Sequence, residues 1–261
     1  MFSEINNENN RAKYHLVAHR GYSQHFPENT LLAIQGALDA GAKYIEIDIQ
    51  LSADKQAVVF HDRDLNRLCQ QPKAIHDYEL SQLKTFSSYS PERFGEQYKG
   101  EKIATLNEVV TLLENYPDVT LFVELKRISI SYHGIDEMLQ VVLSCLNSIL
   151  DQCVLISFSL EILESLRSQV SLPIGAVIDD WNDALTIHHE RLQVLAPNYF
   201  FCDIDTLPID GPLKLLNSKI VTYECTNTEQ AVSALHRGVD FIETFDIEMM
   251  INEIDRIWRE K

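Results

Sequence analysis

Two acidic residues alternate with isoleucines in the short segment Ile-Glu-Ile-Asp-Ile, residues 45–49. In a β-strand this alternation places Glu46 and Asp48 on the same face, about 7 Å apart. Glu124 and Lys126 are also two residues apart, at the end of Thr-Leu-Phe-Val-Glu-Leu-Lys. Three carboxylates packed together raise one another's pKa, and a divalent cation between them removes this conflict. Ligand sets made only of oxygen favour Mg²⁺, Mn²⁺ or Ca²⁺ over zinc.

Two histidines also lie directly after apolar segments. His19-Arg20 follows Leu-Val-Ala, and His61 follows Ala-Val-Val-Phe. A free imidazole titrates near pH 6.5, so at neutral pH one histidine can accept a proton while the other donates one. Arg20 and Lys126 are of the types that commonly bind phosphate. Together with a divalent cation, the three carboxylates and two basic side chains carry one positive charge in total, which suits a phosphodiester.

Each of these features also has an ordinary structural explanation. A histidine that follows a strand is often structural, and Glu124 with Lys126 could form an ion pair on one strand face. We expect Asp62 only to cap a turn. We favour a common site for the other residues, because all the segment ends are polar while the alternating positions before them are apolar.

Strand-like and helix-like segments alternate through almost the whole sequence. This order predicts a parallel sheet covered by helices, and about eight such units predict a closed TIM (β/α)8 barrel, whose catalytic groups lie at the carboxyl ends of the strands. The expected strands are residues 15–19, 44–49, 57–61, 120–125, 154–158, 174–178, 199–202, 220–224 and 241–244. The expected helices are residues 30–40, 106–115, 134–150, 160–170, 228–237 and 247–259.

The regular alternation is interrupted at two places. Only twelve residues separate Asp48 from His61, too few for a helix and a return strand, so we expect either a tight hairpin around residues 53–55 or an extended return. Residues 64–105 are polar and irregular, and we expect a small helical insertion there, after the third strand. Residues 1–13 are expected to form a flexible tail and residues 14–261 a single domain.

Composition excludes several classes of function. The net charge of −17 argues against binding to nucleic acid or to anionic membrane surfaces. No run of 18 apolar residues occurs, so we expect no membrane insertion. Five widely spaced cysteines and a polar N-terminus without a signal-like apolar region favour a reducing compartment, and we expect a cytoplasmic protein. The sequence does not indicate an oligomeric state.

Ordered motifs resemble those of glycerophosphodiester phosphodiesterases. The first part of the resemblance comprises His-Arg-Gly-Tyr at 19–22, Phe-Pro-Glu-Asn-Thr at 26–30, Gly-Ala-Lys-Tyr-Ile-Glu-Ile-Asp at 41–48 and Val-Val-Phe-His-Asp at 58–62. It continues with Ala-Thr-Leu-Asn-Glu-Val-Val at 104–110, Glu-Leu-Lys at 124–126, Ile-Ser-Phe at 156–158 and Gly-Val-Asp-Phe-Ile at 238–242. The resemblance spans about residues 14–245.

This resemblance implies a TIM barrel with a helical insertion and a metal-dependent phosphodiesterase. By resemblance Glu46, Asp48 and Glu124 hold one divalent cation, Mg²⁺ or Ca²⁺ with Mn²⁺ as a further candidate. His19 and His61 are the acid/base pair, and Arg20 and Lys126 bind the phosphate. The implied reaction converts glycerophosphocholine, glycerophosphoethanolamine and similar small diesters to sn-glycerol 3-phosphate and an alcohol.

The sequence departs from the family pattern in its last third. The family's Trp-Thr-Val-Asn reads Glu224-Cys-Thr-Asn227 here, and its closing Ile-Ile-Thr-Asp reads Ile-Glu-Thr-Phe at 242–245. Glu224 and Asn227 are therefore candidates for a changed pocket wall, where Glu224 could attract a cationic head group.

Two alternative functions stay open at this point. One is a related phosphodiesterase that acts on lysophospholipids, and the other is a barrel that binds a phosphodiester without hydrolysing it.

Overall fold

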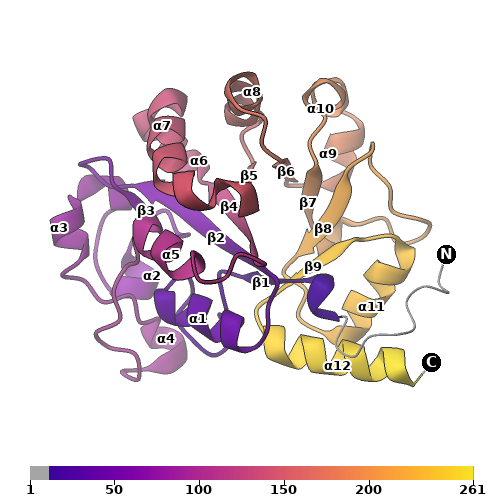
Figure 1. Cartoon of the computed structure of the whole chain (residues 1–261), viewed down its shortest axis with the longest axis horizontal. Helices are drawn as coiled ribbons and strands as arrows, with labels where there is room; N and C mark the ends of the chain where they lie inside the picture. Colours follow the sequence, from indigo (N-terminus) through magenta and orange to yellow (C-terminus); the bar gives the residue numbers. More distant parts are fainter. Residues whose placement is uncertain (1–11, 261) are drawn as a thin grey trace.

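Eight parallel strands form a closed barrel in the computed structural model, which describes residues 12–260. The barrel closes because β1 pairs with both β9 and β2, and Figure 1 shows the helices around it. The predicted TIM barrel is confirmed. Its strands are β1 Leu16–His19, β2 Tyr44–Leu51, β4 Thr120–Leu125, β5 Cys153–Ser157, β6 Ile174–Ile178, β7 Tyr199–Asp203, β8 Lys219–Tyr223 and β9 Phe241–Thr244.

The short strand β3, Ala57–Val59, is not part of the parallel barrel. It runs antiparallel to β2, with Val58 opposite Gln50. The chain turns between them at Ala53 and Asp54; the Lys55 amide donates to the Ser52 carbonyl at 2.9 Å, and the backbone φ of Lys55 is +60°. The tight hairpin was one of the two alternatives expected, whereas counting residues 57–61 among the parallel strands was wrong. His61 consequently lies on the loop after β3.

Helices follow most of the barrel strands and cover their outer faces. They are α1 Leu31–Asp39, α5 Leu106–Leu113, α6 Arg127–His133, α7 Ile135–Leu146, α8 Leu160–Gln169, α9 Trp181–Leu185, α10 His189–Leu195, α11 Thr228–Arg237 and α12 Ile247–Arg259. The predicted helix 134–150 is shorter than expected, because the chain continues from α7 as the 3₁₀ helix Asn147–Gln152. Residues 204–218, between β7 and β8, contain a 3₁₀ turn, Ile204–Thr206, and no α-helix. Buried Leu213 and Leu215 belong to this segment.

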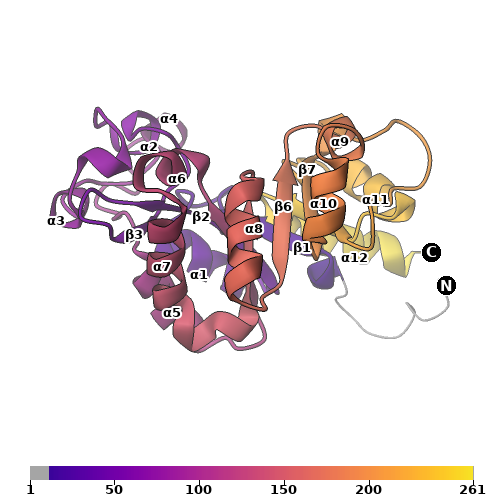
Figure 2. The same ribbon diagram turned by 90° about the horizontal axis from the view of Figure 1, so that it is seen from above.

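The predicted insertion is present between β3 and α5. It contains α2 Asn66–Cys69, a 3₁₀ turn Ile75–Asp77, α3 Leu80–Leu83 and α4 Pro91–Phe94, and Figures 1 and 2 show these helices grouped beside β3. It has a small apolar core of its own, which includes Phe60, Leu65 and Leu68. Arg93 Nη1 donates to the Ser23 carbonyl at 2.9 Å, so the insertion also contacts the loop after β1.

The alternation in β2 separates two environments. Ile45, Ile47 and Ile49 face outward into the large core under the helices, while Glu46 and Asp48 share the inward face of the strand. Deeper inside the barrel a second core is formed by Val17, Phe122, Val154, Ile156, Val177, Phe201, Val221 and Phe241. The carboxylates thus lie above an apolar floor.

The predicted N-terminal tail, residues 1–13, falls mostly outside the described residues. Within them, Ala12–Tyr14 form a 3₁₀ helix, and the amide of buried Ala12 donates to Asp255 Oδ1 of α12 at 2.8 Å. Among residues 12–260, no helix combines the length and apolar character needed to cross a lipid bilayer.

Candidate active site

Three buried carboxylates meet at the carboxyl ends of neighbouring strands. The parallel register places Asp48 of β2 opposite Glu124 of β4, and Glu46 of β2 opposite His19 of β1. Ligand oxygens of Glu46, Asp48 and Glu124 all lie within 4.8 Å of one another. The prediction that these three side chains come together is confirmed.

The carboxylates are in electrostatic conflict. Burial, and then the charge of Asp48, raise the pKa of Glu46 well above its usual value, and burial also raises the pKa of Glu124. Burial disfavours ionised Asp48 too, but nearby positive charges, Lys126 foremost, lower its pKa below the usual range. Glu46 Oε1 has no hydrogen-bond partner among the described residues. An oxygen-only cluster with an unpaired buried oxygen fits a hard divalent cation.

His19 is almost completely buried. Its Nε2 lies 3.8 Å from Glu46 Oε2 and 3.9 Å from Glu243 Oε2, and its ring stacks on Phe245 with the ring centroids 4.9 Å apart. Burial, and then the charge of Arg20, lower the pKa of His19 well below its usual value. His19 is therefore neutral at neutral pH and can accept a proton.

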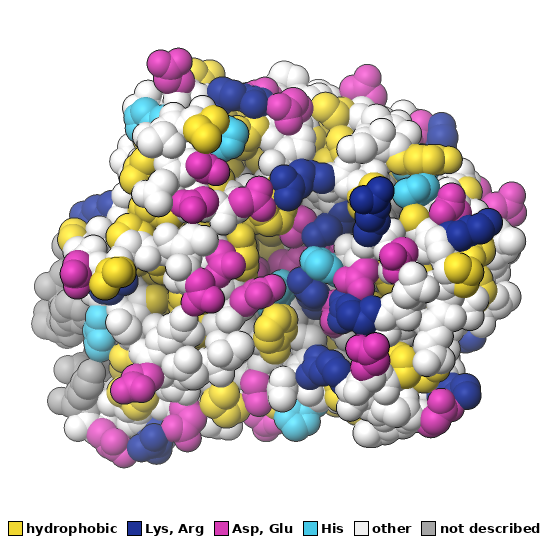
Figure 3. Space-filling model, turned by 180° about the vertical axis from the view of Figure 1, so that it is seen from behind, with side chains coloured by type: hydrophobic (Ala, Val, Ile, Leu, Met, Phe, Trp, Pro, Cys, Tyr) yellow, Lys and Arg dark blue, Asp and Glu magenta, His cyan; other side chains and the backbone are white. Residues whose placement is uncertain are grey.

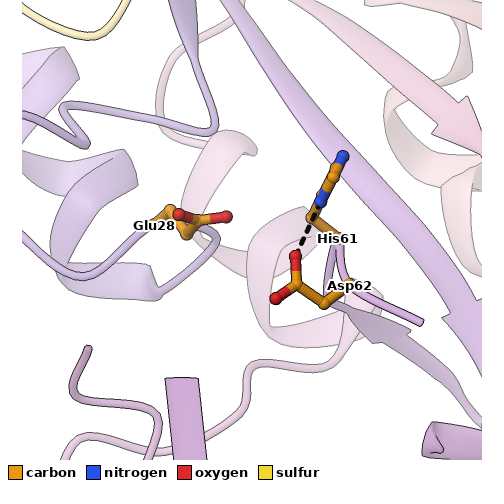
Figure 4. Close-up of side chains that lie close together, drawn as sticks. All are labelled: Glu28, His61 and Asp62. Atoms are coloured by element: carbon orange, nitrogen blue, oxygen red, sulfur yellow. Dashed lines mark hydrogen bonds and ion pairs between the residues drawn. The ribbon is translucent and has the colours of Figure 1, made fainter. Parts of the chain in front are cut away.

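His61 is more exposed, with 32% of its side chain accessible. Its Nδ1 is 2.9 Å from Asp62 Oδ1, a contact drawn in Figure 4. Gln50 Nε2 donates to the carbonyls of Phe60 and Asp62 at 2.9 and 2.8 Å, which fixes this loop. The expectation that Asp62 only caps a turn was wrong, because its carboxylate contacts a candidate catalytic histidine.

Arg20 and Lys126 lie directly beside the carboxylates. Lys126 Nζ is 2.8 Å from Glu124 Oε1 and 3.1 Å from Asp48 Oδ1, and Arg20 Nε is 3.4 Å from Asp48 Oδ2. The turn after β1 is sharp, with a backbone φ of +58° at Arg20 and +78° at Gly21. A Cβ atom at Gly21 would lie 2.6 Å from the Ala33 carbonyl carbon, so this turn requires glycine.

The segment Phe26-Pro-Glu-Asn-Thr30 supports the site, a role that the sequence did not reveal. Asn29 Nδ2 donates to Asp48 Oδ2 at 2.8 Å, and the Asp48 amide donates to Asn29 Oδ1 at 3.2 Å. Thr30 Oγ1 accepts from the Ala33 amide and caps α1. Asn29 therefore fixes the orientation of one carboxylate in the cluster.

Glu243 is a fourth buried carboxylate that the sequence analysis did not assign to the site. It lies two residues after inward-facing Phe241 on β9, so the period of two could have revealed its direction. Burial, and then the charge of Glu124, raise its pKa well above the usual value. Its Oε1 has no hydrogen-bond partner within residues 12–260.

The two candidate pocket-wall residues follow β8. Glu224 is exposed, with a backbone φ of +61°. Asn227 Oδ1 accepts from the Gln230 amide at 2.8 Å and caps α11. The cap explains asparagine at position 227, and a substrate contact by either residue stays a prediction.

Polar side chains also mark the surface of the molecule. Figure 3 shows a face on which acidic, basic and histidine side chains gather around a central hollow.

A separate cavity of about 710 Å³ lies at the opposite end of the barrel, where Tyr199 and Lys219 begin β7 and β8. That cavity contains none of the candidate site residues.

Comparison with known proteins decides the family. The sequence profile of the Glycerophosphoryl diester phosphodiesterase family matches residues 19–205. The chain belongs to this family. It is 30% identical over 243 residues to a glycerophosphodiester phosphodiesterase of Caldanaerobacter subterraneus subsp. tengcongensis, a match that covers 91% of this chain and 96% of the relative. The enzyme class that the motifs indicated, a glycerophosphodiester phosphodiesterase, is confirmed.

Solved structures of glycerophosphodiester phosphodiesterases share the fold over nearly the full length. An Oleispira antarctica phosphodiesterase in complex with the product sn-glycerol-3-phosphate superposes with a TM-score of 0.82 at 25% identity, covering 92% of this chain and 96% of that one. The Thermotoga maritima glycerophosphodiester phosphodiesterase gives a TM-score of 0.71 at 25% identity, covering 91% and 97%. Enzymes of this family generally depend on a divalent metal, which agrees with the carboxylate cluster.

Proposed function

We propose that this enzyme hydrolyses small glycerophosphodiesters, such as glycerophosphocholine and glycerophosphoethanolamine, to sn-glycerol 3-phosphate and an alcohol. The observation that carries the proposal is the convergence of seven side chains at one end of the barrel. Three carboxylates, two basic side chains and two histidines meet there: Glu46, Asp48, Glu124, Arg20, Lys126, His19 and His61. The product bound to the Oleispira antarctica relative supports the same product class here.

Glu46, Asp48 and Glu124 would hold one divalent cation, Mg²⁺ or Ca²⁺, with Mn²⁺ as a further candidate. When bound, the cation supplies Lewis-acid polarisation of a phosphoryl oxygen. Arg20 and Lys126 bind the remaining phosphoryl oxygens and stabilise the negative charge that builds up on them. In this role the two basic side chains exchange part of their present contacts with Asp48 and Glu124 for the substrate.

The two histidines would divide the proton transfers between them. Neutral His19 accepts the proton of the attacking oxygen, from water or from the 2-hydroxyl of the glycerol moiety. Asp62 accepts a hydrogen bond from Nδ1–H of protonated His61, so that the Nε2 hydrogen is the one delivered to the departing alkoxide. This assignment makes His19 the base and His61 the acid in the first step.

The direct test follows sn-glycerol 3-phosphate formed from glycerophosphocholine by the purified protein, with EDTA and after addition of Mg²⁺, Mn²⁺ or Ca²⁺. We expect product only with an added cation. His19→Ala and His61→Ala should each lower kcat by roughly 10²- to 10⁴-fold, while the control His236→Ala, at an exposed histidine, keeps full activity. The proposal would be refuted if the protein hydrolysed none of several glycerophosphodiesters in the presence of any of these cations.

A further inference from the structure

Glu28, His61 and Asp62 form a second cluster of polar side chains next to the candidate active site. Their potential ligand atoms lie within 4.8 Å of one another, and Figure 4 draws the three side chains. Such a cluster could in principle hold a metal ion. Here, however, a positive charge already lies between the two carboxylates, supplied by Arg67 of the insertion.

Arg67 makes a bidentate contact with each carboxylate. Its Nη1 and Nη2 donate to Glu28 Oε2 and Oε1 at 2.7 and 2.8 Å. Its Nε and Nη2 donate to Asp62 Oδ2 and Oδ1, both at 2.7 Å. Four charge-assisted bonds from one planar guanidinium are strong and directional, and the single ammonium of a lysine cannot reproduce this geometry. The guanidinium therefore takes the place that a cation would need.

Each of the two carboxylates also contacts a candidate active-site residue. Asp62 Oδ1 lies 2.9 Å from His61 Nδ1, and Glu28 Oε1 accepts from Arg20 Nη1 at 2.9 Å. Burial disfavours ionised Glu28 and Asp62, but their hydrogen bonds with the neighbouring basic side chains outweigh it and lower the pKa of both. Both acids are thus ionised at neutral pH, as these contacts require.

Arg67 is itself held in place by the insertion. It lies in the single-turn helix α2 between Leu65 and Leu68, which are completely buried in the insertion's own core. The guanidinium is thus presented by a packed element whose position depends on how the insertion folds against the barrel.

We propose that Arg67 is a positioning residue that aligns His61 through Asp62 and Arg20 through Glu28. Through Arg67, the insertion thereby fixes the orientation of both the histidine, His61, and the phosphate-binding arginine, Arg20. The inference rests on the roles of His61 and Arg20 given under the proposed function. It predicts effects on kcat through Asp62 and on KM through Glu28.

The kinetic test compares Arg67→Met, Arg67→Lys, Asp62→Asn and Glu28→Gln with the wild-type enzyme on glycerophosphocholine. We expect Asp62→Asn to lower kcat on the order of 10-fold or more, Glu28→Gln mainly to raise KM, and Arg67→Met to do both. Arg67→Lys should recover less than half of the loss in kcat/KM, because it keeps the charge but not the two bidentate contacts. The matched control is Arg93→Met, which removes another arginine between the insertion and the barrel and should keep wild-type kinetics.

A second measurement does not depend on turnover. In ¹⁵N-histidine NMR spectra, the His61 signal is assigned by its loss in His61→Ala. At a pH at which His61 is neutral, that is, after the Nε2 hydrogen has left, the wild-type protein should show the Nδ1-protonated tautomer, since Nδ1–H is held by Asp62. We expect a mixture of His61 tautomers in Arg67→Met. A lower stability of this variant does not affect the test as long as its NMR spectrum is that of a folded protein. Arg67→Lys serves as the second variant should Arg67→Met not fold.

The outcomes separate the two proposals. A wild-type protein that hydrolyses no glycerophosphodiester refutes the proposed function, and the NMR measurement then still tests the positioning of His61. An active wild type with unchanged kcat, KM and tautomer in folded Arg67→Met overturns the role of Arg67 alone. Equal losses in Arg67→Met and Arg93→Met would also overturn it, since they would reflect only the docking of the insertion.

Discussion

Glu243 Oε2 lies 3.9 Å from Nε2 of His19, almost as close as Glu46 Oε2 at 3.8 Å. The candidate base is therefore flanked by two buried carboxylates, of which only Glu46 belongs to the predicted metal cluster. Glu243 lies on β9 in the segment Ile-Glu-Thr-Phe, where the resemblance of the motifs implies isoleucine. Because it adds negative charge without a hydrogen-bond partner for Oε1 within residues 12–260, it should reduce the stability of the metal-free protein.

Glu243→Gln is expected to raise the free energy of unfolding of the metal-free protein at pH 7 by about 1 to 3 kcal/mol. The folded-state pKa of Glu243 is raised, so the folded protein binds this proton more tightly than the unfolded chain. The stability of the wild type therefore falls as pH rises from the pKa of Glu243 in the unfolded chain, about 4.3, through its higher pKa in the folded protein. Glu243→Gln has no proton to lose and escapes this fall in stability. Urea unfolding in EDTA from pH 4 to 8 measures the difference, with exposed Glu229→Gln as the control. A difference that shrinks as pH rises would contradict this interpretation.

A divalent cation should stabilise the folded protein at the carboxylate cluster. At a free concentration 100 times its Kd, a ligand that binds only the folded state adds about 2.7 kcal/mol, which corresponds to roughly 5 to 10 °C in Tm for a chain of this size. Calorimetry with and without Mg²⁺ or Ca²⁺ measures the shift. Glu124→Gln should abolish most of it, whereas Glu114→Gln, at an exposed helix end, should leave it intact. An equal shift in both variants would place the cation elsewhere.

The sequence predicted the cluster because strand alternation and parallel pairing, two regular patterns, suffice to place its three carboxylates. Glu46 and Asp48 are fixed on one face by the period of two in β2, and parallel register then brings Glu124 beside Asp48. Arg67 contacts Glu28, 39 positions before it, and Asp62, 5 positions before it. Both contacts depend on how the insertion packs against the barrel, and neither strand alternation nor parallel pairing predicts that packing.

The error in the predicted fold, at β3, has a similar cause. The strand around β3 is apolar whichever way it runs, so composition could not show that it pairs antiparallel with β2. Between β7 and β8, by contrast, no helix was predicted and no α-helix forms. Pro208, Gly211 and Pro212 favour a loop over a helix there, and Leu213 and Leu215 of this loop are buried in the large core.

His61→Ala should affect substrates according to their leaving groups. An alkoxide such as that of choline needs a proton as it departs, whereas p-nitrophenolate is stable without one. We therefore expect a loss of roughly 10²- to 10⁴-fold in kcat for glycerophosphocholine and a much smaller loss for a p-nitrophenyl phosphodiester of glycerol. His19→Ala should slow both substrates alike, since the base is needed in either case. The reverse pattern would exchange the two histidines' roles.

Head-group preference can be tested at Glu224 with a substitution that its backbone conformation tolerates. Its φ of +61° disfavours a bulky aromatic residue at this position, so Glu224→Trp would mix strain with any change in recognition. Glu224→Gln keeps the size and removes only the charge. Because the side chain is exposed, we expect kcat/KM for glycerophosphocholine to fall only about 2- to 5-fold, with no change for an uncharged head group such as glycerol. Equal effects on both substrates would show that Glu224 does not recognise the cationic head group.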